Sequence, residues 1–295
     1  MKRKIGAHVS ASGGLDKAMQ RASDIGANCV QLFSGSPRVW KRKDLDKFDV
    51  KSMFAKQEEL GVKPIFTHSL YLANLATDKP DLLRKSFDAL MYDLEFDSLI
   101  KGSGIIVHIG SHTGRGWDAV KEQVASQIAK LIEQSPKNST FLIENSAGQK
   151  GKLCSDLEEI RWLFDSISKL VSPAIIKKLG WCFDTCHAHA AGYLLSKPGK
   201  NSQTLIPQKN AVETITRLNL WSTLKCIHVN DSRDDFDSGR DRHDNLGEGH
   251  IPKEDLKYFV NHEEVKNVPL LLEVPGFEKK GPDAKNIEYL RSICE

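Results

Sequence analysis

Side chains that bind metals stand at the ends of short apolar segments throughout this sequence. Six segments follow the pattern and read PIFTH, GIIVH, TFLIE, GWCFD, KCIH and PLLLE. Their last residues are His68, His108, Glu144, Asp184, His228 and Glu273. Imidazole nitrogens and carboxylate oxygens are ligands for divalent metals such as zinc. The repeated placement predicts a metal cluster, provided that the fold brings the segment ends together.

The elements that would do so are parallel β-strands. Each segment is short and bounded by polar or glycine-containing residues, as in strands buried on both faces. Helical patterns lie between them, such as the buried face predicted at Leu83, Phe87, Leu90, Met91 and Leu94. Two further strands near residues 4–9 and 29–33 complete eight β–α units. We therefore predict an α/β fold, a single (β/α)8 TIM-type barrel domain over residues 1–295, with its active site at the C-terminal face of the strands.

Alternation within the strands predicts which way these side chains point. Glu144 shares a strand face with Leu142, and Asp184 shares one with Cys182. If the apolar partners fill the barrel interior, the carboxylates point inward as well. A buried ring of Glu144, Asp184 and Glu273 without cations would cost several kcal/mol per charge. This cost predicts at least one bound metal.

Another group of ligand types follows the strands. His187 comes three residues after Asp184 in DTCH, across what we expect to be a tight loop. Asp241 and His243 are two residues apart, so an extended segment presents both to one side. The spacing suits one further metal, held by His187, Asp241 and His243. His8 ends the first strand without a partner of obvious spacing and is expected to be structural or to support a ligand.

Composition narrows the class of protein. Lys and Arg total 42 against 39 acidic residues, so a net charge of +3 neither requires nor excludes nucleic acid. The start, MKRKIGAHVS, lacks the apolar stretch of a secretory signal, and no run of about 18 apolar residues predicts a membrane span. Six scattered cysteines without a CxxC pair are typical of reduced thiols in an intracellular protein. Cys182 and Cys186 are close enough to pair or to bind metal instead.

Loops and helix starts give further expectations. Ser155 is a candidate N-cap for a helix near residues 156–170, supported by Glu158 three residues later. A longer connection at about residues 190–207 leads to the helix before Trp221. The polar, glycine-rich segment 231–252 is expected to be a functional or disordered loop. Its charges, and those of residues 41–43, are candidates for phosphate contacts or for ordinary solvated surface.

Several ordered stretches resemble the endonuclease IV family of apurinic/apyrimidinic (AP) endonucleases, from about residue 5 to about residue 276. They read GAHVSASGG, SPRVW, HSLYLANLA, VHIGSH, ENSAGQ, FDTCHAHAAGY, HVNDSR, DRHDNLGEGHI and LLEVPG. The resemblance implies a zinc-dependent enzyme of DNA base excision repair. Such an enzyme hydrolyses the phosphodiester 5′ to an abasic site, leaving a 3′-hydroxyl and a 5′-deoxyribose phosphate. Leu70 and Ser146 depart from the family pattern, which bears on DNA contacts and not on metal ligands.

The resemblance also implies a ligand set for three Zn²⁺ ions. One would be held by His68, His108 and Glu144. A second would share Glu144, the catalytic bridging ligand, and add Asp184, His228 and Glu273. The third would take His187, Asp241 and His243. The DNA-facing rim would include Arg38, Tyr71 and Leu72, the partner would be double-stranded DNA with abasic sites, and the protein would be a monomer.

Three other functions remain open at this point. A divalent-metal sugar isomerase would use the same strand ends but leaves His187, Asp241 and His243 without a role. A UV-damage endonuclease has related chemistry, although DTCHAHAAGY and DRHDNLGEGHI resemble endonuclease IV more. A non-catalytic DNA-binding protein with structural zinc is expected to have a closed, Cys-rich site. Incubation with an abasic duplex and with aldose or ketose sugars separates these functions.

Overall fold

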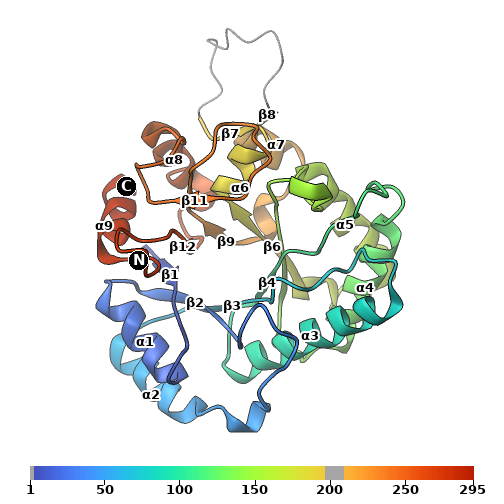
Figure 1. Cartoon of the computed structure of the whole chain (residues 1–295), viewed down its shortest axis with the longest axis horizontal. Coiled ribbons are helices and arrows are strands. Elements are labelled where there is room, and N and C mark those ends of the chain that lie inside the picture. The colour runs from blue at the N-terminus through green and yellow to red at the C-terminus, as the bar shows by residue number, and fades with distance from the viewer. Residues whose placement is uncertain (1–2, 197–208) are drawn as a thin grey trace, which may run out of the picture.

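The computed structural model describes residues 3–196 and 209–295, and its centre is a closed barrel of eight parallel strands (Figure 1). The strands are β1 (Ile5–His8), β2 (Cys29–Phe33), β3 (Ile65–His68), β4 (Ile105–Val107), β5 (Phe141–Glu144), β6 (Leu179–Asp184), β9 (Leu224–His228) and β12 (Leu270–Leu272). Neighbours along the chain pair in order, and β12 closes the barrel against β1. The predicted TIM-type barrel is confirmed.

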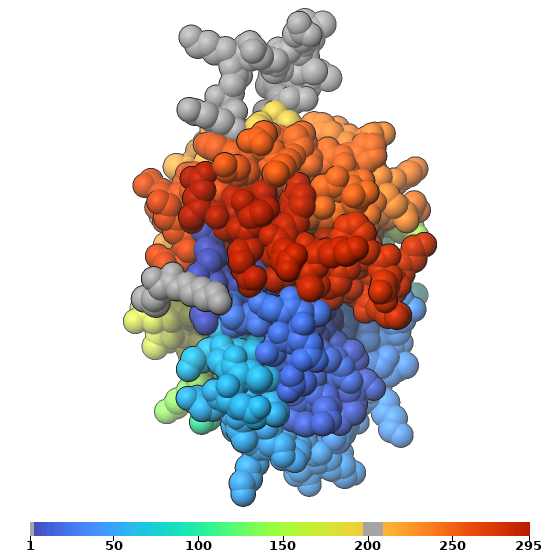
Figure 2. Space-filling model, turned by 90° about the vertical axis from the view of Figure 1, so that its left-hand side faces the viewer, coloured from blue at the N-terminus to red at the C-terminus, as the bar shows by residue number. Residues whose placement is uncertain are grey.

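Helices surround the strands on the outside of the barrel, except for the short α6, which lies over the C-terminal mouth (Figure 1). The helices are α1 (Leu15–Asp24), α2 (Val50–Leu60), α3 (Pro80–Leu99), α4 (Lys121–Gln134), α5 (Leu157–Leu170), α6 (Thr185–Ala190), α7 (Ala211–Arg217), α8 (Lys253–Val260) and α9 (Ala284–Ile293). N-terminal segments (blue) and C-terminal segments (red) adjoin on the face shown in Figure 2, and Arg291 Nη2 of α9 donates to the carbonyl of Gly26, just after α1, at 2.9 Å. Among the described helices, none is both long and apolar enough to cross a membrane.

The barrel interior is a separate apolar cluster with one residue from each of seven strands. Its members are Cys29, Phe66, Ile106, Leu142, Cys182, Cys226 and Leu271. Two residues beyond six of them, toward the C-terminal face, come the His, Glu and Asp side chains that the sequence analysis selected. The predicted strand parity is therefore confirmed, because alternate residues of a strand share a face.

The inner face of α3 is less apolar than its pattern predicts. Leu90 and Leu94 are fully buried as expected, but Asp93 and Asp97 are fully buried with them. Asp93 accepts a hydrogen bond from Ser34 Oγ at 2.5 Å, which ties the helix to the loop after β2. Burial raises the pKa of Asp93 to about 6 and that of Asp97 to about 7. The helical spacing of apolar residues could not reveal these buried carboxyls.

Two local predictions are corrected. Asp156, not Ser155, caps α5, and its carboxylate accepts the N–H of Glu158 at 3.1 Å. The DTCH segment is not a plain loop but starts α6, because Asp184 lies at the N-cap and accepts the N–H of His187 at 2.8 Å. Much of the connection at residues 190–207 lies outside the described residues.

The segment 231–252 is an ordered loop, which its composition alone did not decide. Its strands β10 (Asp231–Ser232) and β11 (His243–Asp244) pair antiparallel and return His243 over the barrel mouth. The buried Asp231 carboxylate accepts backbone N–H groups from Gly247 at 2.9 Å and Ile251 at 3.0 Å. A side chain at Gly249 would meet this carboxylate, since an added Cβ would lie 2.4 Å from Asp231 Oδ1.

The cysteines are all free thiols. Cys182 fills the barrel interior, whereas Cys186 lies on α6, so the alternative of a disulfide between them is wrong. Burial raises the pKa of the Cys182 thiol well above its usual value. Such a thiol is a poor metal ligand, because metals bind the thiolate.

Candidate metal centre

Glu144 lies at the centre of the side chains that converge at the C-terminal mouth of the barrel. Its Oε2 lies 3.4 Å from His68 Nε2 and 3.3 Å from His108 Nε2. Its Oε1 lies 3.0 Å from His228 Nδ1. The carboxylate is almost fully buried, with 1% of the residue exposed. One oxygen of this carboxylate thus faces the imidazoles of His68 and His108, and the other faces the imidazole of His228.

A second group of candidate metal ligands, most of them carboxylates, surrounds His228. Its Nδ1 lies 3.3 Å from Glu273 Oε2 and 3.7 Å from Asp184 Oδ2. Together with Glu144, these residues offer four ligand atoms within 4.8 Å of one another. The strand ends that the sequence placed far apart therefore meet as predicted.

The third group of candidate ligands, His187, Asp241 and His243, lies farther out from the barrel interior, where α6 and the β10–β11 loop meet. His187 Nε2 lies 3.0 Å from Asp241 Oδ1, and His243 Nε2 lies 3.5 Å from the same oxygen. By mutual proximity, His187 and Asp241 also group with His108, while His243 groups with Asp184 and Cys186. Lys152 Nζ approaches the other oxygen of Asp241 at 3.3 Å. This set is therefore less separate from its neighbours than its spacing in the sequence indicated.

The carboxylates of the cluster favour the protonated, positively charged form of the histidine beside them. Burial opposes ionisation of His187, yet Asp184 and Asp241 raise its pKa to about 10. Burial also opposes ionisation of Asp241, but His187 and His243 hold the pKa of that carboxyl well below its usual value. In contrast, burial lowers the pKa of His108 to about 4. A cluster of this kind accepts protons or metal cations as its counter-charge.

The donor atoms fit zinc by geometry and by their lack of other partners. Glu144 Oε2, His187 Nε2 and His243 Nε2 are buried, and despite their close neighbours none of them forms a hydrogen bond of regular geometry with a described residue. Buried polar atoms without partners are rare and call for an unseen ion or water. Ligand atoms of a tetrahedral zinc stand roughly 3.4 Å apart, given bonds of about 2.1 Å. The 3.3 and 3.4 Å separations around Glu144 Oε2 match this value.

Histidine orientation is fixed by hydrogen bonds on the far side of each ring. His68 Nδ1 donates to the carbonyl of Ser69 at 2.8 Å, and His187 Nδ1 donates to the carbonyl of Asn145 at 3.0 Å. Carbonyl oxygens only accept, so the neutral form of each ring carries its proton on Nδ1 and presents an unprotonated Nε2 to the cluster. Metal-binding histidines are usually held in this way.

Sequence reasoning missed three amide side chains of the site. Asn145 Oδ1 accepts the N–H of Asp184 at 2.7 Å. Asn230 Nδ2 donates to Asp184 Oδ2 at 2.7 Å, and its Oδ1 accepts the N–H of Glu273 at 2.8 Å. Gln31 on β2 contacts His228 and Glu273. For Gln31 the signal was available, because it follows Cys29 by two residues in a predicted strand.

The rim residues lie where the predicted DNA-facing loops meet. Tyr71 is 55% exposed, and its ring stands edge-on to His68 with centroids 5.7 Å apart. Its N–H donates to the carbonyl of Pro37 at 3.0 Å, which joins the loop after β3 to the loop that carries the exposed Arg38. Leu72 is half-buried and packs against the core. Of these three residues, Tyr71 and Arg38 are freely presented at the surface.

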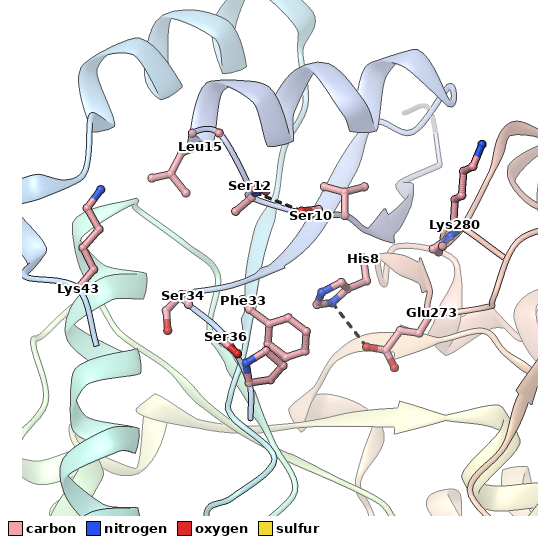
Figure 3. A pocket seen from close by; sticks show the side chains of 18 of the residues that line it. His8, Ser10, Ser12, Leu15, Phe33, Ser34, Ser36, Lys43, Glu273 and Lys280 are labelled. Carbon is pink, nitrogen blue, oxygen red and sulfur yellow. Dashed lines mark hydrogen bonds and ion pairs between the residues drawn. The ribbon is translucent and has the colours of Figure 1, made fainter. Parts of the chain in front are cut away.

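A cleft of about 1190 Å³ opens beside the metal centre. His8 and Glu273 lie in it, with His8 Nδ1 3.8 Å from Glu273 Oε1, and Lys43 and Lys280 stand on opposite sides (Figure 3). Burial lowers the pKa of His8 to about 4, so this imidazole is neutral near pH 7. Basic walls that lead to a buried cluster can accommodate an extended anionic substrate.

Comparison with known proteins identifies the class of barrel to which the chain belongs. The family described as "Xylose isomerase-like TIM barrel" matches residues 19–293. A D-tagatose 3-epimerase-like protein shares the fold alone, with a TM-score of 0.70, 17% identity, and coverage of 98% of this chain and 96% of that chain.

Relatives that match the full length of the chain identify a particular family within this class of barrel proteins. "Probable endonuclease 4" of Halothermothrix orenii is 34% identical over 288 residues, covering 98% of this chain and 99% of that protein. The protein of the same name from Methanoculleus marisnigri is 33% identical over 291 residues, covering 98% of each chain. The crystal structure of endonuclease IV from Thermus thermophilus has a TM-score of 0.81 and 29% identity, covering 98% of both chains. The chain belongs to the endonuclease IV family, and it is a hydrolase of the endonuclease class.

Proposed function

We propose that the protein is a zinc-dependent AP endonuclease that hydrolyses the phosphodiester 5′ to an abasic site in double-stranded DNA. The observation that carries the proposal is the position of Glu144, whose Oε2 faces His68 and His108 and whose Oε1 faces His228, at 3.0–3.4 Å. A substrate of this kind places the protein in the compartment that holds DNA. A single barrel domain would act as a monomer.

Three zinc ions would be shared among nine residues. His68, His108 and Glu144 would hold one ion, and Asp184, His228 and Glu273 would hold a second together with Glu144. His187, Asp241 and His243 would hold the third. When bound, zinc lowers the pKa of a water molecule and stabilises charge on a phosphoryl group.

The chain's own residues would position the metal ions and neutralise the charge of the phosphodiester. Glu144 would fix the spacing of two ions through its two oxygens, and the buried walls around it would exclude bulk water. The net positive charge of the loaded site would bind the phosphodiester, while Lys43 and Lys280 on the cleft walls would contact neighbouring phosphates. A water molecule would attack phosphorus and lose a proton, while the bond from phosphorus to the upstream O3′ breaks and O3′ gains a proton to become the 3′-hydroxyl.

The products of one cleavage test this proposal. A duplex with a single abasic site should be cut once, leaving a 3′-hydroxyl and a 5′-deoxyribose phosphate, and an intact duplex should stay uncut. Hydrolysis forms no Schiff base, so borohydride should trap no covalent adduct of enzyme and DNA. Gel analysis of both ends of the cut strand measures the result, and a trapped adduct would instead establish a lyase.

A sugar isomerase is the second candidate, because its fold and strand-end ligands are similar. It leaves His187 and Asp241 unexplained, although their side chains are 3.0 Å apart at the mouth. Aldose or ketose conversion by the zinc-loaded protein, without nicking of abasic DNA, would favour this candidate.

We further expect Tyr71 to recognise the damaged site. An abasic nucleotide lacks stacking, and a planar side chain can enter the gap and offset part of the unstacking cost, about a few kcal/mol per step. Tyr71→Ala should lower kcat/KM for incision by roughly 10- to 100-fold, or about 1.4 to 2.7 kcal/mol. The thermal midpoint should stay unchanged because the ring is 55% exposed.

Controls separate recognition from packing. Leu170 is 57% exposed at the end of α5, so Leu170→Ala should change neither incision nor stability. Leu72→Ala should lower the midpoint as well as incision, since this side chain packs against the core. Unaltered incision and duplex affinity in an Arg38→Ala, Tyr71→Ala, Leu72→Ala triple variant would exclude insertion of these side chains into the gap at the abasic site.

A further inference from the structure

Gln31 occupies the same level of the barrel as the proposed metal ligands. The step from an interior residue to a ligand is two residues on six strands, as from Leu142 to Glu144. The same step on β2 leads from Cys29 to Gln31, which is fully buried. A buried amide at this level must find hydrogen-bond partners within the cluster.

Its partners are two members of a single ligand set. Gln31 Nε2 donates to Glu273 Oε1 at 2.5 Å, and Gln31 Oε1 accepts from His228 Nε2 at 2.7 Å. The second amide hydrogen is directed at His8 Nδ1, 2.9 Å from Gln31 Nε2. Both amide hydrogens and the amide oxygen of Gln31 therefore have hydrogen-bond partners. These hydrogen bonds connect β2 to β9 and to the end of β12 across the barrel.

These contacts determine the tautomer of His228. A carboxylate only accepts, so the amide nitrogen must face Glu273, and the amide oxygen must face His228. His228 Nε2 then carries a proton, which leaves Nδ1 as the ligand atom. That atom is the one that faces Glu144 Oε1 at 3.0 Å and Glu273 Oε2 at 3.3 Å.

Glu273 is oriented by the same amide. Its Oε1 is occupied by Gln31, and its Oε2 is the oxygen directed at His228 Nδ1. One side chain thus fixes a ligand atom on each of two residues, and both atoms belong to the set that also contains Glu144 and Asp184.

We propose that Gln31 is a positioning residue that sets the metal affinity of the Glu144–Asp184–His228–Glu273 site by fixing the ligand atoms of His228 and Glu273. The proposal rests on the metal centre of the proposed function. It assigns no contact between Gln31 and the metal or the DNA. Residues that orient metal ligands typically change affinity by about 10- to 100-fold when they are replaced.

Gln31→Met tests the role, because methionine has a similar length and neither donates nor accepts strongly. We expect the affinity of one zinc per chain to fall by about 10- to 100-fold, with the remaining zinc retained. Elemental analysis after dialysis and competition with a chromophoric chelator measure both quantities. Incision should fall at limiting zinc and recover when zinc is added in excess.

Two further variants keep the test decisive. Gln31→Glu can still accept from His228 but places a carboxylate against Glu273, so it should weaken the same zinc even if Gln31→Met is poorly folded. Gln123 also makes two hydrogen bonds, to the carbonyls of Leu75 and Thr77, away from the cluster. Gln123→Met should therefore leave zinc content unchanged.

The outcomes separate this proposal from the one on which it rests. Wild-type protein that binds no zinc would contradict the metal centre itself. Wild-type protein that binds zinc, with the same affinity in Gln31→Met and Gln31→Glu, would overturn only the positioning role.

Discussion

Glu144→Ala is expected to abolish incision of abasic DNA while the barrel stays folded. One oxygen of the side chain faces His68 and His108 and the other faces His228, so its loss would remove a ligand from two ions at once. Metal assistance contributes several kcal/mol of transition-state stabilisation. A loss of about 4 kcal/mol corresponds to roughly a 1000-fold decrease in kcat. Single-turnover incision assays, together with zinc content per chain, measure the effect.

The folded state of this variant needs its own measurement. Circular dichroism should remain that of the wild type, because the strand backbone of β5 is paired on both sides. Glu158 on α5 offers a matched control, since its carboxylate forms a surface ion pair with Arg217. Glu158→Ala should retain full incision. Wild-type activity in Glu144→Ala would refute the bridging role.

Removal of metal is expected to have the second largest effect, on stability as well as on activity. Without cations, the buried carboxylates of Glu144 and Asp184 and the half-buried carboxylate of Glu273 lose their metal counter-charge. A ligand at 1,000 times its dissociation constant stabilises the folded state by about 4.1 kcal/mol. For a protein of this size, we expect a chelator to lower the thermal midpoint by on the order of 10 °C. Calorimetry before and after dialysis against the chelator measures the shift.

Restoration and pH complete the metal experiment. Zinc added back should recover both the midpoint and incision, and protein saturated with zinc before limited chelation should show neither loss. Histidine ligands must be deprotonated to bind zinc, and the pKa of His187 is raised to about 10, so stabilisation by zinc should keep growing as the pH rises from about 6 toward about 10. An unchanged midpoint in protein shown to be free of metal would contradict the cluster.

Much of this barrel could be predicted from the sequence because its strands are short, apolar and buried on both sides. Their ends at His68, Glu144, Asp184 and His228 were correct to the residue, since ligand types interrupt the apolar pattern there. Strand parity then determined which side chains point inward. These are local properties, and they depend on a periodicity of two residues.

Helix starts and loops were less predictable because they depend on competing local hydrogen bonds. Ser155 and Asp156 are both good capping residues, and only the backbone conformation decides between them. The segment 231–252 is polar throughout, so its pattern could not show that Asp231 organises it through backbone N–H groups. Without that loop, Asp241 and His243 would have no defined distance from His187.

The sequence by itself therefore determined the barrel and the types of residue at its mouth, because alternation and strand length are encoded locally. Tertiary structure alone decided which atoms face each other. It placed Glu144 between His228 on one side and His68 and His108 on the other, and it directed the amide of Gln31 toward His228 and Glu273. These distances join residues from strands far apart in the chain, and they follow from the closure of the barrel by β1 and β12. No local pattern carries that information.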